Sequence, residues 1–300
     1  MIRFSVEQKV YNIGGIEIGG QPGERPTVLV GSIFFAGHRI VHDPVKGLFD
    51  RDKAKTLLQQ EAEVSAFTGN PRFLDVVGDT AEALINYIEF VAVHSEAPIL
   101  VDSPLQRVRI EVISHFAGSE IMPRLIYNSI AEDHTEEELA CLKDCGVKSA
   151  VLLAFGTKAI KPEARVELLK DDLLPAAESA AIENIIIDTG VLDVSSVSWA
   201  SLAIREVKEK LGFPAGCAPA NAMYAWEKMK ARGAPAFQTA ASATLALAKS
   251  QGADFLFYGS LQNAPWVYSA VATMDALIAY GGRFSGLRVA TQEHPLYRVL

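Results

Sequence analysis

The sequence predicts a (β/α)8 barrel, an α/β fold, formed by one domain over residues 1–300. Short runs rich in Val, Ile and Leu recur at fairly regular intervals, and most are apolar throughout. Such runs are typical of parallel strands that are covered on both faces. Amphipathic segments lie between them, and a strand followed by a helix, repeated eight times, is the pattern of this barrel. No repeat, low-complexity stretch or linker divides the chain.

The first 26 residues have a different pattern. The stretches "KVYNIGG" and "IEIGG" alternate between apolar and polar residues and break at glycines, which predicts a short β-hairpin within residues 1–26. We expect this hairpin to cap the bottom of the barrel. An open doubly wound sheet is the competing fold, but its glycine-rich phosphate turn follows the first strand. Here the glycine-rich stretch 14–26 precedes the first predicted strand.

The predicted elements follow one another along the rest of the chain. The strands are residues 27–34, 72–79, 98–104, 124–130, 149–156, 184–190, 214–221 and 254–260. Apolar residues at helical spacing predict helices, most clearly at 79–95, 135–146, 195–212 and 263–281. In the helix at 135–146, Thr135 and Glu138 have the spacing of a capping box, and Gly146 is a C-cap signal.

The composition excludes several classes of protein. Hydrophobic residues make up 49% and charged residues 21% of the chain, which favours a large core over disorder. A net charge of −8 argues against non-specific nucleic-acid binding, which needs a basic surface. Three cysteines make no disulfide framework, and the N-terminus does not resemble a signal peptide. No window has the roughly 18 apolar residues of a membrane span. We therefore expect a cytoplasmic protein.

Several predicted strands end on a carboxylate or an amide. In a (β/α)8 barrel the carboxyl ends of the strands surround the active site, so these side chains should point into the substrate mouth. Asp and Asn also cap helices and begin turns, which is the alternative for any single position. A ring of them is costly to bury unless it binds something. The ring comprises Asp75, Asp79, Asp102, Asn128, Asp188 and Asn221.

The residue types in this ring favour an organic ligand over a metal. His38 and His42 follow the first strand at a loose spacing, and we expect no metal site. There is no G-x-S-x-G elbow, and no lysine ends a strand. A carboxylate can accept two parallel N–H donors from a guanidine-like edge, and an amide can donate and accept at once. Pterins present such an edge, and nucleobases and guanidines would satisfy the same chemistry.

The sequence also resembles a known family. The stretches "IGGQPGERPTVLVGSIFF", "GLFDR", "TGNPRFLDVVGDTAEAL", "YNSI" and "LFYGSLQNA" are similar to the H subunit of tetrahydromethanopterin S-methyltransferase and its bacterial homologues. The resemblance extends from about residue 7 to about residue 280, and the N-terminal stretch is its most specific part. More distantly, the strand ends resemble methyltetrahydrofolate:corrinoid methyltransferases and other pterin-binding barrels. The resemblance implies a (β/α)8 barrel of the pterin-binding type.

The resemblance assigns roles to five residues. It implies that Asp102, Asn128 and Asp188 hold the pterin ring, that Asn221 forms a hydrogen bond near N5, and that Asp75 is the strand-two acid. The catalytic group would be Asn221 with Asp102 and Asp75, one of the two acids delivering a proton through water. The folate enzymes have G-x-S-N around the strand-seven Asn, whereas this chain has "GCAPAN". Asn263 on the last loop is therefore the alternative to Asn221.

The implied reaction moves a methyl group between a corrinoid and N5 of a tetrahydropterin. Tetrahydrofolate is the expected co-substrate, giving 5-methyltetrahydrofolate, and the H subunit of the methanogenic complex, using methanopterin, is the alternative. The chain has no D-x-H-x-x-G motif, so the cobalamin or other corrinoid should be carried by a partner protein. Related barrels are dimers, so a homodimer is expected by analogy.

Two other functions compete with this interpretation. A condensation like that of dihydropteroate synthesis needs a diphosphate site, usually with basic residues on the last strand, but the last strand here ends "FYGS". A non-catalytic scaffold barrel, its polar rim filled by internal hydrogen bonds, is the third possibility.

Overall fold

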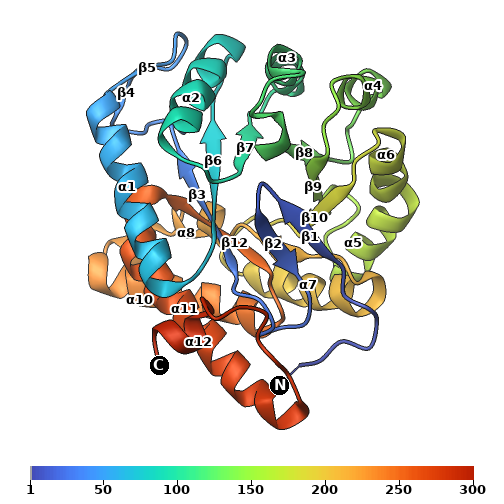
Figure 1. The fold of residues 1–300 in the computed structure, drawn as a ribbon, viewed down its shortest axis with the longest axis vertical. Helices are drawn as coiled ribbons and strands as arrows, with labels where there is room; N and C mark the ends of the chain where they lie inside the picture. Colours follow the sequence, from blue (N-terminus) through green and yellow to red (C-terminus); the bar gives the residue numbers. More distant parts are fainter. Residues whose placement is uncertain (1) are drawn as a thin grey trace.

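A computed structural model of the chain describes residues 2–300 and contains a closed barrel of eight parallel strands surrounded by helices (Figure 1). The order around the barrel is β10-β11-β12-β3-β6-β7-β8-β9. The last strand of the barrel, β12, therefore pairs with its first strand, β3. The predicted fold class is confirmed. The strands are β3 (Val28–Ile33), β6 (Arg72–Val77), β7 (Ile99–Asp102), β8 (Leu125–Ile130), β9 (Ser149–Leu153), β10 (Asn184–Asp188), β11 (Ala215–Cys217) and β12 (Phe255–Ser260).

Helices cover the outside of the barrel and connect its strands. Thr135 caps its helix as predicted, because its side chain accepts a hydrogen bond from the Glu138 N–H. The α-helices are α1 (Arg51–Thr68), α2 (Ala81–His94), α3 (Gln106–Phe116), α4 (Glu136–Asp144), α5 (Pro162–Leu168), α6 (Leu174–Ser179), α7 (Val197–Leu211), α8 (Pro219–Met223), α9 (Glu227–Lys230), α10 (Ala234–Ser250), α11 (Ala264–Gly282) and α12 (Pro295–Arg298). A two-stranded ribbon, β4 (Val41–Asp43) and β5 (Leu48–Phe49), lies in the first loop. Among the described helices, none is long and apolar enough to cross a membrane.

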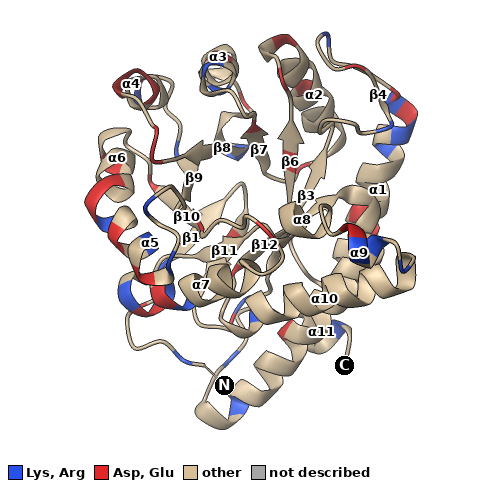
Figure 2. Ribbon diagram, turned by 180° about the vertical axis from the view of Figure 1, so that it is seen from behind, with Lys and Arg blue, Asp and Glu red and all other residues tan. Residues whose placement is uncertain are grey.

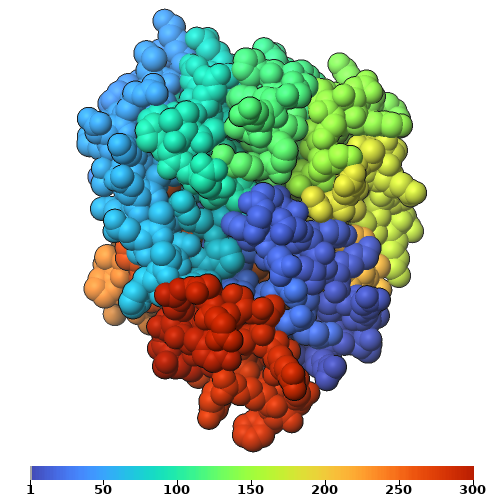
Figure 3. Space-filling view, in the orientation of Figure 1, coloured from blue at the N-terminus to red at the C-terminus, as the bar shows by residue number. Residues whose placement is uncertain are grey.

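The predicted hairpin is present and closes the N-terminal end of the barrel. Strands β1 (Val10–Ile13) and β2 (Ile16–Gly19) are antiparallel. Ile13 and Ile18 are buried among the apolar residues of the barrel interior. Figure 3 shows the N-terminal segment, in dark blue, beside the red C-terminal segment, and the Ala290 N–H donates to the Glu24 carbonyl between them at 2.8 Å. The hairpin is therefore an integral part of the core.

Strand alternation determines which side chains enter the barrel. Successive residues of a strand point to opposite faces, so a residue two positions after an interior one is also interior. An apolar layer inside the barrel is formed by Val30, Phe73, Leu100, Ile126, Val151, Ile186 and Phe255. Two residues further along β6, β7, β8 and β10 come Asp75, Asp102, Asn128 and Asp188. The polar residues thus form the next layer, at the carboxyl ends of the strands.

The seventh strand is shorter than the sequence predicted. The prediction extended it over 214–221, but β11 ends at Cys217 and the helix α8 begins at Pro219. Proline has no N–H to donate to a strand ladder, and its fixed φ suits the first turn of a helix. Asn221 therefore lies on a short helix above the barrel, and the prediction of a strand end at this residue was wrong.

Candidate functional site

A cavity of about 490 Å³ lies at the carboxyl ends of the barrel strands. All of the predicted pterin-site residues line it: Asp75, Asp102, Asn128, Asp188 and Asn221. The other lining residues come mainly from β3, β8, β12 and α8, and they are Ser32, Phe35, Val77, Ser129, Leu153, Ala218, Ala220, Tyr224, Phe257, Gly259 and Ser260. In Figure 2, seen from the side opposite Figure 1, red acidic segments of β6 and β7 lie inside the ring of helices. The structure thus brings the predicted residues together.

Asp75, which is buried, and Asp102, which is partly buried, form an acid pair on neighbouring strands. Asp75 faces Ser32 across the β3–β6 ladder, and the Ser32 hydroxyl donates to Asp75 Oδ2 at 2.7 Å. Burial raises the pKa of Asp75 to about 6, and the hydrogen bond from Ser32 opposes this shift. Burial and the adjacent Asp75 charge raise the pKa of Asp102 well above its usual range. Like charges this close disfavour double ionisation, so the pair retains a proton to higher pH than an isolated carboxyl would.

Asp188 is buried on the other side of the cavity. Its Oδ1 accepts a hydrogen bond from the Gly190 N–H at 2.7 Å. Burial raises the pKa of Asp188 to about 6, opposed by this hydrogen bond and by the charge of Arg165. Asp188 is therefore mostly ionised at pH 7. Gly190 has φ +71°, and a Cβ there would lie 2.4 Å from Phe155, so the turn that supplies this N–H requires glycine.

Asn128 and Asn221 supply amides at different depths. Asn128 is the ladder partner of Asp102, so its amide lies on the strand next to the acid pair. Asn221 is exposed on α8, where it lines the outer part of the cavity. The Asn221 amide therefore lies where it would contact a ligand from the solvent side, whereas Asn128 lies deeper in the barrel.

Two other sequence expectations do not match the structure. Asp79 is exposed and does not line the cavity, because it precedes Thr80, the N-cap of α2. Including it in the ring was wrong. Asn263 does not line the cavity either. Its amide nitrogen donates to the Tyr224 hydroxyl, and its Oδ1 accepts from Trp266 Nε1 at 3.2 Å. Asn263 therefore holds Tyr224 in place, and the geometry does not support it as a substitute for Asn221.

Sequence reasoning missed several lining residues, of which Ser32 and Tyr224 have the clearest positions. Ser32 lies two residues after the interior Val30, so strand alternation could have found it. Tyr224 follows Asn221 by three positions, a helical spacing that puts both on one face. Its ring packs closely against Gly259, where a Cβ would lie 2.4 Å away. No sequence signal indicates that contact.

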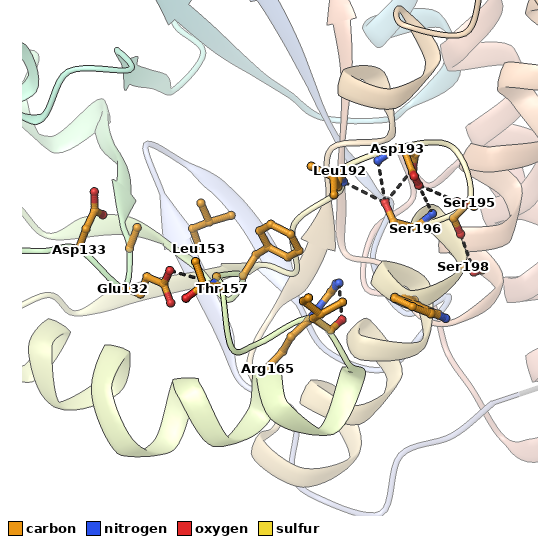
Figure 4. Close-up of a pocket in the computed structure, with 15 residues that line it drawn as sticks. Glu132, Asp133, Leu153, Thr157, Arg165, Leu192, Asp193, Ser195, Ser196 and Ser198 are labelled. Carbon is orange, nitrogen blue, oxygen red and sulfur yellow. Dashed lines mark hydrogen bonds between the residues drawn. The ribbon is translucent and has the colours of Figure 1, made fainter.

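A larger cavity of about 740 Å³ lies beside the first and shares Leu153 with it (Figure 4). Its wall is largely apolar, with Phe155, Ile160, Leu192 and Trp199. Two of its acids are engaged with loop backbone: Glu132 accepts from the Thr157 N–H at 3.0 Å, and Asp193 accepts from the Ser196 N–H at 2.7 Å. The smaller cavity is therefore the candidate functional site, because it contains the carboxylates whose pKa values are raised by burial.

His38, which follows the first barrel strand, has a structural role. His38 is buried, its Nδ1 accepts from the Phe34 N–H at 3.1 Å, and its ring stacks on Phe35. Over residues 2–300, no three His, Cys, Asp or Glu side chains are grouped so that they could hold a metal ion. Cys141, Cys145 and Cys217 are free thiols.

The chain matches known proteins over nearly its whole length. Residues 6–289 match the family "Tetrahydromethanopterin S-methyltransferase MtrH subunit". The H subunit of tetrahydromethanopterin S-methyltransferase from Methanopyrus kandleri is 35% identical over 310 residues, covering 96% of each chain. The H subunit of the putative methyltransferase mtx from Methanosarcina mazei is also 35% identical, covering 93% of this chain and 94% of that one.

Solved structures extend the comparison to the fold. Dihydropteroate synthase from Xanthomonas albilineans, in complex with 7,8-dihydropteroate, superposes with a TM-score of 0.61 at 18% identity, covering 89% of this chain and 98% of that one. The enzyme from Yersinia pestis gives 0.62 at 13% identity, covering 89% and 98%. At these identities the likeness shows a shared barrel. The sequence matches go further: this chain belongs to the family of the H subunit of tetrahydromethanopterin S-methyltransferase, and its relatives are methyltransferases.

Proposed function

We propose that this protein transfers a methyl group between N5 of a tetrahydropterin and the cobalt of a corrinoid that a partner protein carries. The convergence of Asp75, Asp102, Asn128 and Asp188 on one cavity is the observation that carries this proposal. The relatives' names specify tetrahydromethanopterin, and that pterin is our first candidate. Tetrahydrofolate, expected from the sequence, gains no support from these comparisons and becomes the second substrate to assay.

The side chains fit the hydrogen-bonding edge of a pterin. The ionised Asp188 can accept two parallel N–H donors, an arrangement that gives strong charge-assisted hydrogen bonds. Asp75 Oδ1 is buried and has no hydrogen-bond partner in the described structure. Leaving such an acceptor unpaired costs about 1–3 kcal/mol, which a ligand N–H would recover. Asn128 can donate and accept beside it. The site therefore has the acceptors that a 2-amino-pyrimidinone edge requires.

The acid pair supplies the proton that methyl transfer needs. N5 is a poor leaving group as a neutral tertiary amine, so departure of its methyl group requires a proton at N5. The raised pKa values of Asp75 and Asp102 favour a protonated carboxyl in the pair, and that carboxyl would deliver the proton to N5 through water. The Asn221 amide can turn its carbonyl to accept from protonated N5 or its NH2 to donate to neutral N5. General acid catalysis of this kind contributes about 10²–10⁴ in rate.

The corrinoid would supply the cobalt that takes or gives the methyl group. Its carrier would have to approach the mouth of the barrel, where the exposed Asn221 lies. In the reverse direction N5 is the nucleophile, and the same acid pair takes up its proton. A homodimer remains a prediction.

The cavity composition argues against the condensation reaction of the structural neighbours. That chemistry needs cations for a diphosphate group, and the residues that line the described cavity include neither lysine nor arginine. The resemblance to dihydropteroate synthase therefore concerns the barrel fold.

A spectroscopic assay tests the proposal. Methylcobalamin is mixed with the protein and either tetrahydromethanopterin or tetrahydrofolate, and loss of the methyl–cobalt absorbance is followed. We expect loss with wild type, at least about 100-fold slower transfer with Asp188→Asn, and unchanged transfer with Asp79→Asn, the exposed acid outside the cavity. An unchanged spectrum with both pterins would reject the proposal. Pterin binding without transfer would leave a ligand-binding barrel, and absence of both would favour the scaffold.

A further inference from the structure

Two arginines next to the cavity have no role in the function proposed above. Arg109 is on α3 and is largely buried, with 13% of its side chain exposed. Arg165 is on α5 and is fully buried. Neither belongs to the acid pair or lines the smaller cavity. A buried guanidinium is costly unless its N–H groups are all engaged, so their partners indicate what they do.

Arg109 joins the loops that follow β7 and β8. One of its terminal nitrogens donates to the Ser103 carbonyl at 2.6 Å, and the other donates to the Ser129 carbonyl at 3.3 Å. Ser103 directly follows Asp102, and Ser129 directly follows Asn128. Each carbonyl therefore belongs to the residue after a site side chain.

The rest of the Arg109 guanidinium is anchored from outside the barrel. Its Nε donates to the Tyr127 hydroxyl at 3.1 Å, and a terminal nitrogen lies 3.4 Å from Glu138 Oε1. Tyr127 also donates to Glu138, and Gln106 donates to the other oxygen of that carboxylate at 2.6 Å. The network fixes the guanidinium plane, so both loop carbonyls meet a rigid donor.

Arg165 has the same arrangement on the next two strands. After β10, it donates to the carbonyls of Thr189 and Gly190, the latter at 3.2 Å. In the loop after β9, it donates to the carbonyls of Ala159 at 3.3 Å and Ile160 at 2.9 Å. Thr189 directly follows Asp188. Figure 4 shows Arg165 reaching from its helix beneath the loops that border the larger cavity.

We propose that Arg109 and Arg165 are positioning residues: each guanidinium ties together the loops after two consecutive strands and so holds the site side chains at those strand ends in register. Arg109 holds Asp102 and Asn128, and Arg165 holds Asp188. Arginine is required because its five donors form a planar fork, whereas a lysine ammonium cannot reach several loop carbonyls from one fixed plane. The link to pterin binding rests on the proposed function; the link to loop order does not.

Both arginines also act on the site through charge. Asp188 faces Arg165 of α5, Cys217 of β11 and Asp102 of β7, and Asp102 faces Asp75 of β6 and Arg109. In each case the guanidinium favours the ionised carboxylate and lowers its pKa. Removing the Arg165 charge should therefore shift the pH at which Asp188 ionises upward.

The experiment uses the full chain with Arg109→Lys, Arg165→Lys and Arg165→Met. Arg72→Lys is the matched control. The Arg72 guanidinium is also largely buried, and it donates to Leu58, Glu61 and Ser95 at the other end of the barrel. Hydrogen exchange by mass spectrometry reports the loops without any ligand. We expect Arg109→Lys to speed exchange in residues 103–105 and 129–135 together, and both Arg165 variants to speed it in 154–161 and 189–196 together. The control should leave all four segments unchanged.

Binding of 6-methyltetrahydropterin, the bare ring system, gives the second readout. Each Lys variant should weaken it at least about 10-fold, because the site side chains at the released strand ends lose their fixed positions. The pH midpoint of binding should rise in Arg165→Met but much less in Arg165→Lys, which keeps the charge. A general loss of packing would not produce that difference. Thermal unfolding of each variant identifies any that fails to fold, in which case the other arginine's variant decides.

The outcomes separate this inference from the proposed function. Unchanged exchange in the paired loops would overturn the positioning role, whether or not the protein binds pterin. Wild-type affinity and midpoint in a variant with faster exchange would also overturn it. Faster exchange in the paired loops of a protein that transfers no methyl group would support loop positioning and reject the methyltransferase.

Discussion

The two ends of the barrel treat buried charge in opposite ways. At the N-terminal end, Lys208 Nζ lies 2.6 Å from Asp254, and Lys249 Nζ lies 2.8 Å from Asp275. Asp275 also accepts from the Thr27 backbone N–H and hydroxyl, both at 2.9 Å. Each of these carboxylates has a cation and further donors, and so this end is built for stability.

At the C-terminal end, Asp75 and Asp188 are buried and Asp102 is partly buried, and none of them has a lysine or arginine in salt-bridge contact within the described structure. Their burial is reflected in raised pKa values for all of them. Unpaired acids lower the stability of the folded chain, so their presence together needs another reason. The paired charges at one end of the barrel therefore stabilise the fold, whereas the unpaired acids at the other end are those that the proposed pterin site requires.

The largest expected effect is a loss of stability when a cation is removed from a salt bridge at the N-terminal end of the barrel. Lys249→Met leaves Asp275 buried without its cation, and removal of one partner of a buried pair costs about 3–5 kcal/mol. We expect the free energy of unfolding in urea to fall by this amount, with pterin affinity unchanged in the protein that remains folded. Equal stability of variant and wild type would show that the two ends do not differ in the way described here.

At the C-terminal end of the barrel, removing an acid is expected to increase the free energy of unfolding, by a smaller amount. Asp102→Asn removes a partly buried ionisable group beside Asp75 and keeps the side-chain shape. We expect the free energy of unfolding at pH 8 to rise, because the amide carries no charge to repel Asp75, and to change by less than in Lys249→Met. Binding of 6-methyltetrahydropterin should weaken in the same variant. A loss of stability would mean that Asp102 supports the fold.

The pH dependence of stability and of pterin binding tests the role of Asp188 at the C-terminal end of the barrel. The pKa of Asp188 is raised from 3.8 to about 6 in the folded chain, so its contribution to stability is present below pH 3.8 and is lost as the pH rises through about 6. The stability of wild type relative to Asp188→Asn should therefore fall between pH 4 and pH 7. Pterin binding has the reverse dependence, because it needs the carboxylate, and should weaken as the pH falls through about 6. Urea unfolding and binding titrations across this range measure both.

The smallest expected effect concerns the support of Tyr224. Asn263→Ala removes the amide that holds the Tyr224 hydroxyl, without removing any group that lines the cavity. We expect KM for the pterin to rise by less than about tenfold, the equivalent of one ordinary hydrogen bond, with kcat little changed. Loss of kcat alone would instead place Asn263 in the chemistry.

The sequence was sufficient for those parts of the fold and site that depend on local pattern. Apolar runs located all of the barrel strands, and strand alternation carries Asp75, Asp102, Asn128 and Asp188 to the mouth. Pro219 ended the seventh strand early, a signal that was present in the sequence but was outweighed by the apolar residues around it. Asp79 fitted the strand-end pattern but lies one residue before a helix cap, so the same residue type served a local purpose.

The remaining features depend on contacts between distant segments. The partners of Arg109 are loop carbonyls that every residue possesses, and so no residue pattern indicates them. The commitment of Asn263 to Tyr224 and Trp266 likewise required the packing of α8 against the last loop. Sequence therefore predicts where acids enter the barrel better than it predicts what holds them there.

A calorimetric titration of 6-methyltetrahydropterin at pH 7.5 tests most directly whether the unpaired acids exist to hold a pterin. With wild type we expect saturable heat, at least about tenfold weaker binding in Asp188→Asn, and wild-type binding in Asp79→Asn. Absence of heat with folded wild-type protein, or equal affinity in Asp188→Asn, would contradict this account.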